Sequence, residues 1–185
     1  VIGVLFPNVF ETFMGEVVKG IEDTLYPRDC TVMLSTSRFD RRQEQRILEQ
    51  FAYRGVDGVL VMPNAPFRGE PYGFDHLESF VNRGIPIVLI DRTIDSLTLP
   101  SVVQSDHAGA QQATAALIEQ GCRRLGSVTL DIDVSSIRNR LAGFRAALDA
   151  ASLQPVAEIA LRERNPDATD LRDAIAEAFG GPRAP

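Results

Sequence analysis

The sequence predicts an α/β fold of two lobes, each a parallel sheet doubly wound with helices, with the second lobe incomplete. Short apolar runs alternate along the chain with segments whose apolar residues recur at helical spacing. Strands of a parallel sheet are covered by helices on both faces, so they consist of nearly continuous apolar runs. The pattern restarts near residue 101, and 185 residues provide enough chain for two small lobes.

The first lobe is expected to span residues 1–101, and a sequence signal supports each of its elements. Apolar runs predict the strands, and apolar residues at i, i+3, i+4 and i+7 predict the helices. Gly84 is expected to end the third helix as a C-terminal cap. The expected strands are 2–6, 31–34, 56–62, 87–90 and 101–104, and the expected helices are 14–25, 40–53 and 74–81.

The second lobe is expected to span residues 102–185 and to be only part of a sheet lobe. Two apolar runs predict strands, and Gly121 follows the first of three helical patterns. Both ends of the chain are expected to be cuts in a longer protein, because Val1 lies inside a strand and residues 180–185 resemble a linker. The expected helices are 106–120, 136–151 and 167–179, and the expected strands are 125–130 and 156–161.

Composition argues against several classes of protein. The formal net charge is −6 and the pI is about 5.0, whereas a domain that binds nucleic acid by itself is usually basic. No run approaches the roughly 18 apolar residues of a membrane span, so no membrane partner is expected. Cys30 and Cys122 are too few and too distant for a disulfide framework, and with two histidines they predict no metal site. A reducing compartment is consistent with this cysteine content.

Motifs of catalysis and of phosphate binding are absent from the sequence. It contains no GxGxxG after the first strand, no GxxxxGK[ST], no HExxH, no CxxC and no GxSxG. We therefore expect no catalytic residue, no cofactor and no metal. Instead, small polar side chains follow the predicted strands, where ligands bind in such sheets, and they suit a neutral polyhydroxylated ligand. They are equally the residues of ordinary turns: residues 6–8, 35–37, 62–64, 91–92 and 104–106.

Five segments in register resemble the effector domain of the LacI/GalR family of bacterial transcription regulators. The first comprises the opening Ile-Gly-Val-Leu-Phe-Pro of residues 2–7 together with Val-Lys-Gly-Ile-Glu at 18–22. The others are Gly-Val-Asp-Gly-Val-Leu-Val at 55–61, Gly-Ile-Pro-Ile-Val-Leu-Ile-Asp-Arg at 84–92, the segment 108–124, and Arg-Leu-Ala-Gly-Phe-Arg-Ala-Ala at 140–147. They occur in the order and at the spacing of that family, from residue 1 to about 153.

The resemblance implies a two-lobed fold of the periplasmic-binding-protein type that binds a small effector, such as a sugar, polyol or nucleoside, between its lobes. It also implies a cytoplasmic repressor that acts as a homodimer and contacts DNA only through a helix-turn-helix domain absent from this chain. Carried over by position, Phe13 stacks on the effector with Thr12 beside it, Asp91 accepts hydrogen bonds from it, and Arg140 donates to it. Arg138, two residues before Arg140, is a further candidate for contact with the effector.

Each of these residues also has an ordinary structural interpretation. Arg140 could pair with a surface carboxylate, Asp91 could be a turn residue paired with Arg92, and Phe13 could belong to the core. Arg138 could be solvated. His107 is expected to begin a helix after a cap at Ser105 or Asp106, and His76 is expected at the surface.

The sequence departs from the family pattern near the expected effector site. Glu11-Thr12 replaces the usual Asn-Pro, Met14 replaces a second aromatic residue, and Ser105-Asp106 replaces Asp-Asn. Thr129-Leu130-Asp131 replaces a glycine-rich turn. These changes bear on which ligand is bound more than on the fold.

Two other functions remain open at this point. A periplasmic sugar-binding protein of a transporter has the same fold and would carry a leader upstream of Val1. A nucleotide-dependent α/β enzyme is disfavoured by the missing phosphate motifs. Unpaired sheet edges are expected to make the chain self-associate.

Overall fold

The computed structural model describes residues 1–8, 12–162 and 168–180. They form two compact units, of which the first comprises Val1–Pro66 and Pro71–Val103 and the second comprises Phe67–Glu70 and Gln104–Pro185. The α/β fold with parallel sheets that the sequence predicts is confirmed.

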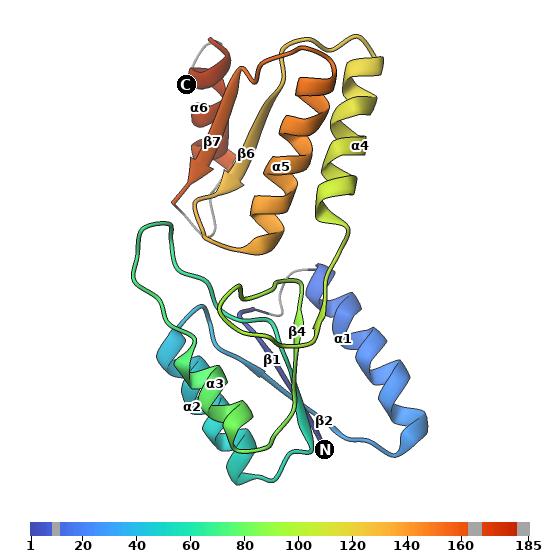
Figure 1. Cartoon of the computed structure of the whole chain (residues 1–185), viewed down its shortest axis with the longest axis vertical. Coiled ribbons are helices and arrows are strands. Elements are labelled where there is room, and N and C mark those ends of the chain that lie inside the picture. Colours follow the sequence, from blue (N-terminus) through green and yellow to red (C-terminus); the bar gives the residue numbers. More distant parts are fainter. Residues whose placement is uncertain (9–11, 163–167, 181–185) are drawn as a thin grey trace. The chain divides into compact units, whose positions relative to one another are not determined.

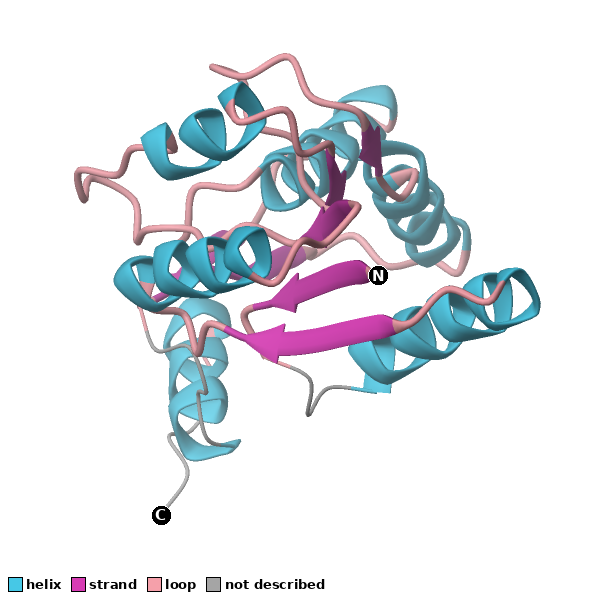
Figure 2. Ribbon diagram, turned by 90° about the horizontal axis from the view of Figure 1, so that it is seen from below, coloured by secondary structure: helices cyan, strands magenta, loops and turns pink. Residues whose placement is uncertain are grey.

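The first unit is built on a five-stranded parallel sheet in the order β2-β1-β3-β4-β5. Helix α1 lies on one side of the sheet and helices α2 and α3 lie on the other, as Figures 1 and 2 show. The strands are β1 (Ile2–Phe6), β2 (Val32–Thr36), β3 (Gly58–Val61), β4 (Ile87–Ile90) and β5 (Ser101–Val102). The helices are α1 (Thr12–Leu25), the short 3-10 helix η1 (Tyr26–Arg28), α2 (Arg41–Tyr53) and α3 (Asp75–Asn82).

Strand β1 is buried on both faces because its alternate side chains enter two separate cores. Val4 and Phe6 pack with Met14 of α1 in one cluster. Leu5 packs on the opposite face in a cluster that includes Phe51 of α2. Fully burying such side chains contributes about 1.5–3 kcal/mol each, so the continuous apolar run is what holds the middle of the sheet.

Glycine at position 3 allows α2 to approach this sheet closely. A Cβ atom there would lie 2.7 Å from Cδ2 of Phe51, which is too close for non-bonded carbon atoms. The Phe51 ring therefore occupies the space that any side chain at position 3 would need.

The second unit contains a two-stranded parallel sheet of β6 (Gly126–Leu130) and β7 (Ala157–Leu161). Helices α4 (Asp106–Glu119) and α5 (Ser135–Ala150) lie on one side of it, and α6 (Ala168–Phe179) lies on the other (Figure 1). A buried cluster joins Leu125, Phe144 and Leu148. An isolated antiparallel β-bridge pairs Phe67 with Ile132, and the segment 67–70 belongs to this unit.

Helices α4 and α5 approach each other at Gly143. A Cβ atom at this position would lie 2.1 Å from the carbonyl oxygen of His107, which belongs to the backbone and cannot rotate away. The absence of a side chain at Gly143 therefore sets the distance between the two helices.

The predicted elements agree with the structure to within about two residues at most ends, and strand 87–90 agrees at both. The second predicted strand, 31–34, lies instead at 32–36, and the short one at 101–104 ends at Val102. The predicted last helix began at Asp167, which lies outside the described residues, and the segment 181–185 does too.

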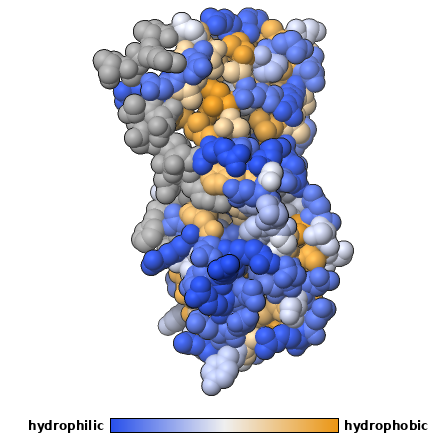
Figure 3. Space-filling view, turned by 90° about the vertical axis from the view of Figure 1, so that its left-hand side faces the viewer, coloured by the Kyte–Doolittle hydropathy of each residue, from blue (hydrophilic) through white to orange (hydrophobic). Residues whose placement is uncertain are grey.

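Apolar side chains remain at the surface of both units. Figure 3 shows apolar surface, in orange, beside hydrophilic surface on the viewed face of the second unit. Large apolar residues that are more than a third exposed in that unit include Leu117, Val128, Leu171 and Ile175. No helix in the described segments has both the length and the apolar character needed to cross a membrane.

Candidate functional site

The carboxyl ends of the five parallel strands define one edge of the first unit, and the polar residues predicted there follow those strands. Ser37 comes after β2, Asn64 after β3 and Asp91 after β4. In open parallel sheets ligands bind at this edge, because the loops and their free polar groups gather there. This edge is the candidate functional site of the first unit.

Asp91 is held in an uncommon backbone conformation at this edge. Its φ angle is 67°, in the left-handed region that side-chain-bearing residues adopt rarely, although Asp tolerates it better than most. The residue is 9% exposed, and its carboxylate pairs with Nε of Arg92 at 3.4 Å, as the turn interpretation expected. Arg92 also donates from Nη1 to the carbonyl oxygen of Pro63 at 2.9 Å. Strain of this kind clusters at functional sites, so the geometry is compatible with either interpretation of Asp91.

Thr12 and Phe13 begin helix α1, near the end of β1 in the chain. Phe13 is 40% exposed, whereas the next residue, Met14, is 7% exposed and belongs to the core. Phe13 is therefore not a core residue, and its ring is accessible for stacking. Thr12 is exposed.

Arg140 of α5 donates from Nε to the carboxylate of Asp106, the first residue of α4, at 2.7 Å. The Arg140 side chain is 51% exposed, but that of Asp106 is only 4% exposed. The partner is thus a buried carboxylate at a helix N-terminus, which favours negative charge, rather than a surface carboxylate. Asp106 holds one edge of the guanidinium and leaves the rest of it accessible.

The remaining candidates lie at the surface, with one exception. Arg138 donates from Nη1 to Asp133 at 2.7 Å, and both side chains are more than a third exposed. His107 is exposed and is the second residue of α4, which agrees with its helix-start interpretation. The surface position expected for His76 is wrong: its side chain is 1% exposed and contacts a buried carboxylate.

That carboxylate, Glu44 of α2, is the residue that sequence reasoning missed. It is fully buried, and it lies on the same helical stripe as Ile47, Leu48 and Phe51. Its position three and four residues before two apolar neighbours is the only sequence signal of its burial. Nothing local indicates that His76, 32 positions later, would be its partner.

No cluster suited to a metal ion occurs among the residues that the structure describes. There is no group of three or more His, Cys, Asp or Glu side chains with that arrangement in residues 1–8, 12–162 and 168–180. The chemistry on offer at the candidate site is hydrogen bonding by carboxylate, amide, hydroxyl and guanidinium groups, with an accessible aromatic ring.

Comparison with known proteins identifies the family of the chain. The whole chain, residues 1–185, matches the family described as periplasmic binding proteins and sugar binding domain of LacI family. Two curated relatives are the transcriptional repressor PurR of Aliivibrio salmonicida, 30% identical, and the ribose operon repressor of Haemophilus influenzae, 27% identical. Each match covers 82% of this chain and 44% of the relative, so the chain spans less than half the length of these curated relatives.

Solved structures support the fold. The transcription regulator GntR of Chromobacterium violaceum is 25% identical, with a TM-score of 0.76, over 97% of this chain and 63% of its own. The LacI transcriptional regulator of Lactobacillus brevis has a TM-score of 0.81 at 23% identity, over 97% of this chain and 65% of its own. The chain therefore belongs to the family of periplasmic binding proteins and sugar-binding domains of LacI-type regulators.

Proposed function

We propose that this chain is the effector-sensing domain of a cytoplasmic transcriptional repressor. The observation that carries the proposal is the nature of the relatives: the PurR and ribose operon relatives, which each match 82% of the chain, are transcriptional repressors. The domain binds a small molecule and performs no chemistry. Within the whole protein it acts as a homodimer, and DNA is contacted by a helix-turn-helix domain outside this chain.

A neutral sugar or a related polyol or nucleoside is the effector class that the site chemistry favours. Thr12, Phe13, Asp91, Arg138 and Arg140 are the side chains that we propose for contact with it. A carboxylate and a guanidinium each engage two neighbouring groups and so fix orientation, and an aromatic ring covers the apolar side of a sugar ring. The described loops contain no glycine-rich phosphate cradle, which favours an uncharged ligand.

Calorimetric titration of the purified chain with D-ribose, L-arabinose, adenosine and fructose 1-phosphate tests this proposal. We expect one of the neutral compounds to bind, and Asp91→Ala to weaken that binding by about 10-fold or more, the loss of a charged hydrogen-bond partner. Asp95→Ala, beyond the same strand, is the matched control. Binding of NAD or ATP with turnover, and of none of the four compounds, would reject the sensor function.

A further inference from the structure

Glu44 occupies a position where an apolar residue would be expected. It is fully buried on the core-facing stripe of α2 beside Ile47 and Leu48. Removing a carboxylate from water costs several kcal/mol unless hydrogen bonds compensate. A buried apolar side chain would stabilise this core at lower cost, so packing alone does not explain a glutamate here.

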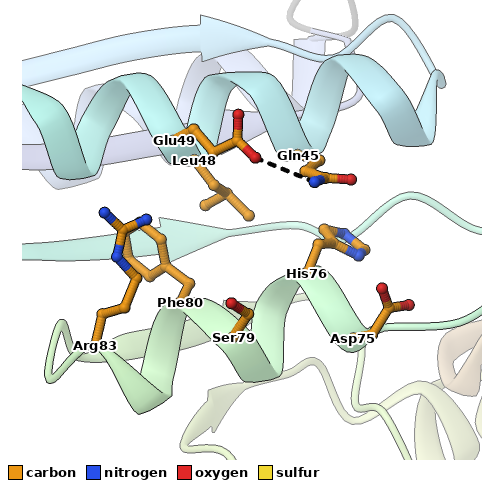
Figure 4. A pocket seen from close by; sticks show the side chains of 8 residues that line it. All are labelled: Gln45, Leu48, Glu49, Asp75, His76, Ser79, Phe80 and Arg83. Atoms are coloured by element: carbon orange, nitrogen blue, oxygen red, sulfur yellow. Dashed lines mark hydrogen bonds between the residues drawn. The ribbon is translucent and has the colours of Figure 1, made fainter.

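Both oxygens of Glu44 are used, each on a different element. Oε2 accepts a hydrogen bond from the backbone N–H of Asn64, in the loop after β3, at 2.7 Å. Oε1 contacts Nε2 of His76, on α3, at 2.7 Å. Figure 4 shows His76 with its ring between α3 and α2. Because Glu44 lies in the first turn of α2, the helix N-terminus also favours its charge.

The network continues from Asn64 to the ends of two further strands. Oγ of Ser37, after β2, donates to Oδ1 of Asn64 at 2.9 Å. The backbone N–H of Ser37 donates to the carbonyl oxygen of Phe6, at the end of β1, at 2.9 Å. One carboxylate therefore links the carboxyl ends of β1, β2 and β3 to the start of α3.

The same turn of α2 also fastens the chain segment that returns to α3. Arg41 donates from Nε to the carbonyl oxygen of Gly73 at 2.9 Å and pairs with Asp75, and its guanidinium lies 5.7 Å from the ring centroid of Tyr72. The hydrogen bond from Arg41 to the Asp75 carboxylate holds the pKa of Asp75 below its ordinary value. Arg41 and Glu44 thus tie down residues 64 and 72–76, the two stems of the connection between β3 and α3.

Two polar atoms of the network lack partners, which is unlike a network that serves stability alone. Nδ2 of Asn64 and Nδ1 of His76 are buried without a hydrogen-bond partner. A partly satisfied buried network is less stable than an apolar core of the same volume. Its benefit must therefore lie in where it places the loop.

We propose that Glu44 is a positioning residue of the effector site that does not itself contact the effector. It holds Asn64, and the carbonyl oxygen of the preceding Pro63 accepts from Arg92, beside the proposed effector contact Asp91. The inference rests on the proposed sensor function. The order of the loop after β3 and the stability of the core should respond differently to this residue. Loss of Glu44 should disorder the loop while leaving the core of the first unit intact.

Amide hydrogen exchange of the purified chain tests the placement without any effector. In the double variant Glu44→Leu/His76→Leu, which fills the space with apolar groups, we expect the Asn64 amide to exchange at least about 10-fold faster, because it loses its acceptor. The amides of Leu5 and Val61, in the core strands, should keep their protection. Glu49→Leu, on the exposed face of the same helix, is the matched control. An Asn64 amide as protected as in the unaltered chain would overturn the inference.

Glu44→Gln provides the conservative variant and guards against a double variant that fails to fold. Its amide oxygen can still accept from Asn64 while its NH₂ faces the other tautomer of His76. We expect Asn64 exchange close to that of the unaltered chain, and an increase as large as in the leucine variant would contradict the hydrogen-bond assignment.

Titration with D-ribose tests the consequence for binding. Loss of a supporting residue that displaces a contacting group by about 1 Å weakens binding by about 10–100-fold, and we expect this for the double variant but less than about 3-fold for Glu44→Gln. Equal affinities in the double variant and the unaltered chain would overturn the inference. If the unaltered chain binds no D-ribose, the titration is made with L-arabinose and adenosine. If it binds none of the three, the proposed effector class is wrong, and the exchange experiment still tests whether Glu44 places Asn64.

Discussion

The interior of each of the two units is stabilised in a different way. In the first unit, one face of the sheet alone buries a cluster of twelve apolar residues, and α1 covers a second cluster on the opposite face. In the described part of the second unit, the cluster around Leu125 contains three buried residues. There a close backbone approach at Gly143 and ion pairs of Arg140 and Arg145 contribute alongside apolar packing. The first sheet thus rests on a large apolar cluster, whereas in the described part of the second unit a smaller cluster is accompanied by closely approaching helices and half-exposed ion pairs.

The largest expected effect is in the apolar core of the first unit. Phe51→Ala removes a ring that is 1% exposed and that occupies the space where a Cβ at position 3 would lie, so we expect a loss of about 3–5 kcal/mol in the free energy of unfolding. Urea unfolding followed by circular dichroism measures it. Tyr53→Ala, 92% exposed on the same helix, should stay within about 0.5 kcal/mol. A loss below about 1 kcal/mol for Phe51→Ala would mean that this core is not the main support of the unit.

The next effect is in the second unit and comes from adding a methyl group. Gly143→Ala places a Cβ atom against the His107 carbonyl oxygen, so α4 and α5 must separate, at a cost of about 3 kcal/mol. Gly109→Ala, on α4 with nothing within 4 Å, should instead stabilise by about 0.5–1 kcal/mol through helix propensity. The free energy of unfolding should therefore fall in Gly143→Ala and rise in Gly109→Ala, and a change of the same sign in both variants would contradict the close approach at Gly143.

A smaller effect is expected on effector affinity when the charged side chain of Arg140 is removed. Arg140→Ala should weaken effector binding by about 1–3 kcal/mol, the cost of a lost charged hydrogen-bond partner. Calorimetry with the effector found by screening measures it. Arg123→Ala, an exposed arginine of the same unit, should leave affinity unchanged. An Arg140→Ala variant with unaltered affinity would limit the arginine to its contact with Asp106.

The smallest effect depends on pH. Arg145 of α5 forms a two-pronged pair with Glu158 of β7, and this hydrogen bond lowers the pKa of Glu158 and raises that of Arg145. A carboxyl group with a lowered folded-state pKa stabilises the fold above its unfolded pKa, and this stabilisation is lost as the pH falls through the folded value. Because the pair is partly exposed, Glu158→Gln should cost only about 0.5 kcal/mol at pH 7.

Unfolding curves at pH 7 and pH 3 check this expectation. The difference between Glu158→Gln and the unaltered chain should shrink at the lower pH, where the glutamate is protonated in the unfolded chain and increasingly so in the folded one. Asp149→Asn, exposed near the end of α5, is the control for a general change in net charge. A difference that grows toward pH 3 would rule out the pair as its source.

The sequence could predict the fold because its signals are periodic and local. Short continuous apolar runs mark the strands, and apolar residues at a period of 3.6 mark the helices, so the strand ends follow from the ends of the runs. The pair of Arg140 with Asp106 could not be predicted, because it joins residues 34 positions apart on two helices. Glu44 was missed for another reason: a carboxylate interrupts an apolar stripe in the sequence, and only the packed structure shows that the stripe includes it. The roles proposed for Thr12, Phe13, Asp91, Arg138 and Arg140 stay predictions.

The place of β1 in the middle of its sheet has a consequence for synthesis on the ribosome. Ile2 pairs with Val32 on one side and with Gly58 on the other, and the neighbouring pair Val1 and Asp57 is 56 positions apart. At about 5–20 residues per second, this strand is made several seconds before its second neighbour exists. During that interval its five-residue apolar run has an open hydrogen-bonding edge. The rate of translation between residues 6 and 58 therefore sets how long β1 of the nascent chain can bind chaperones or the same strand of another copy.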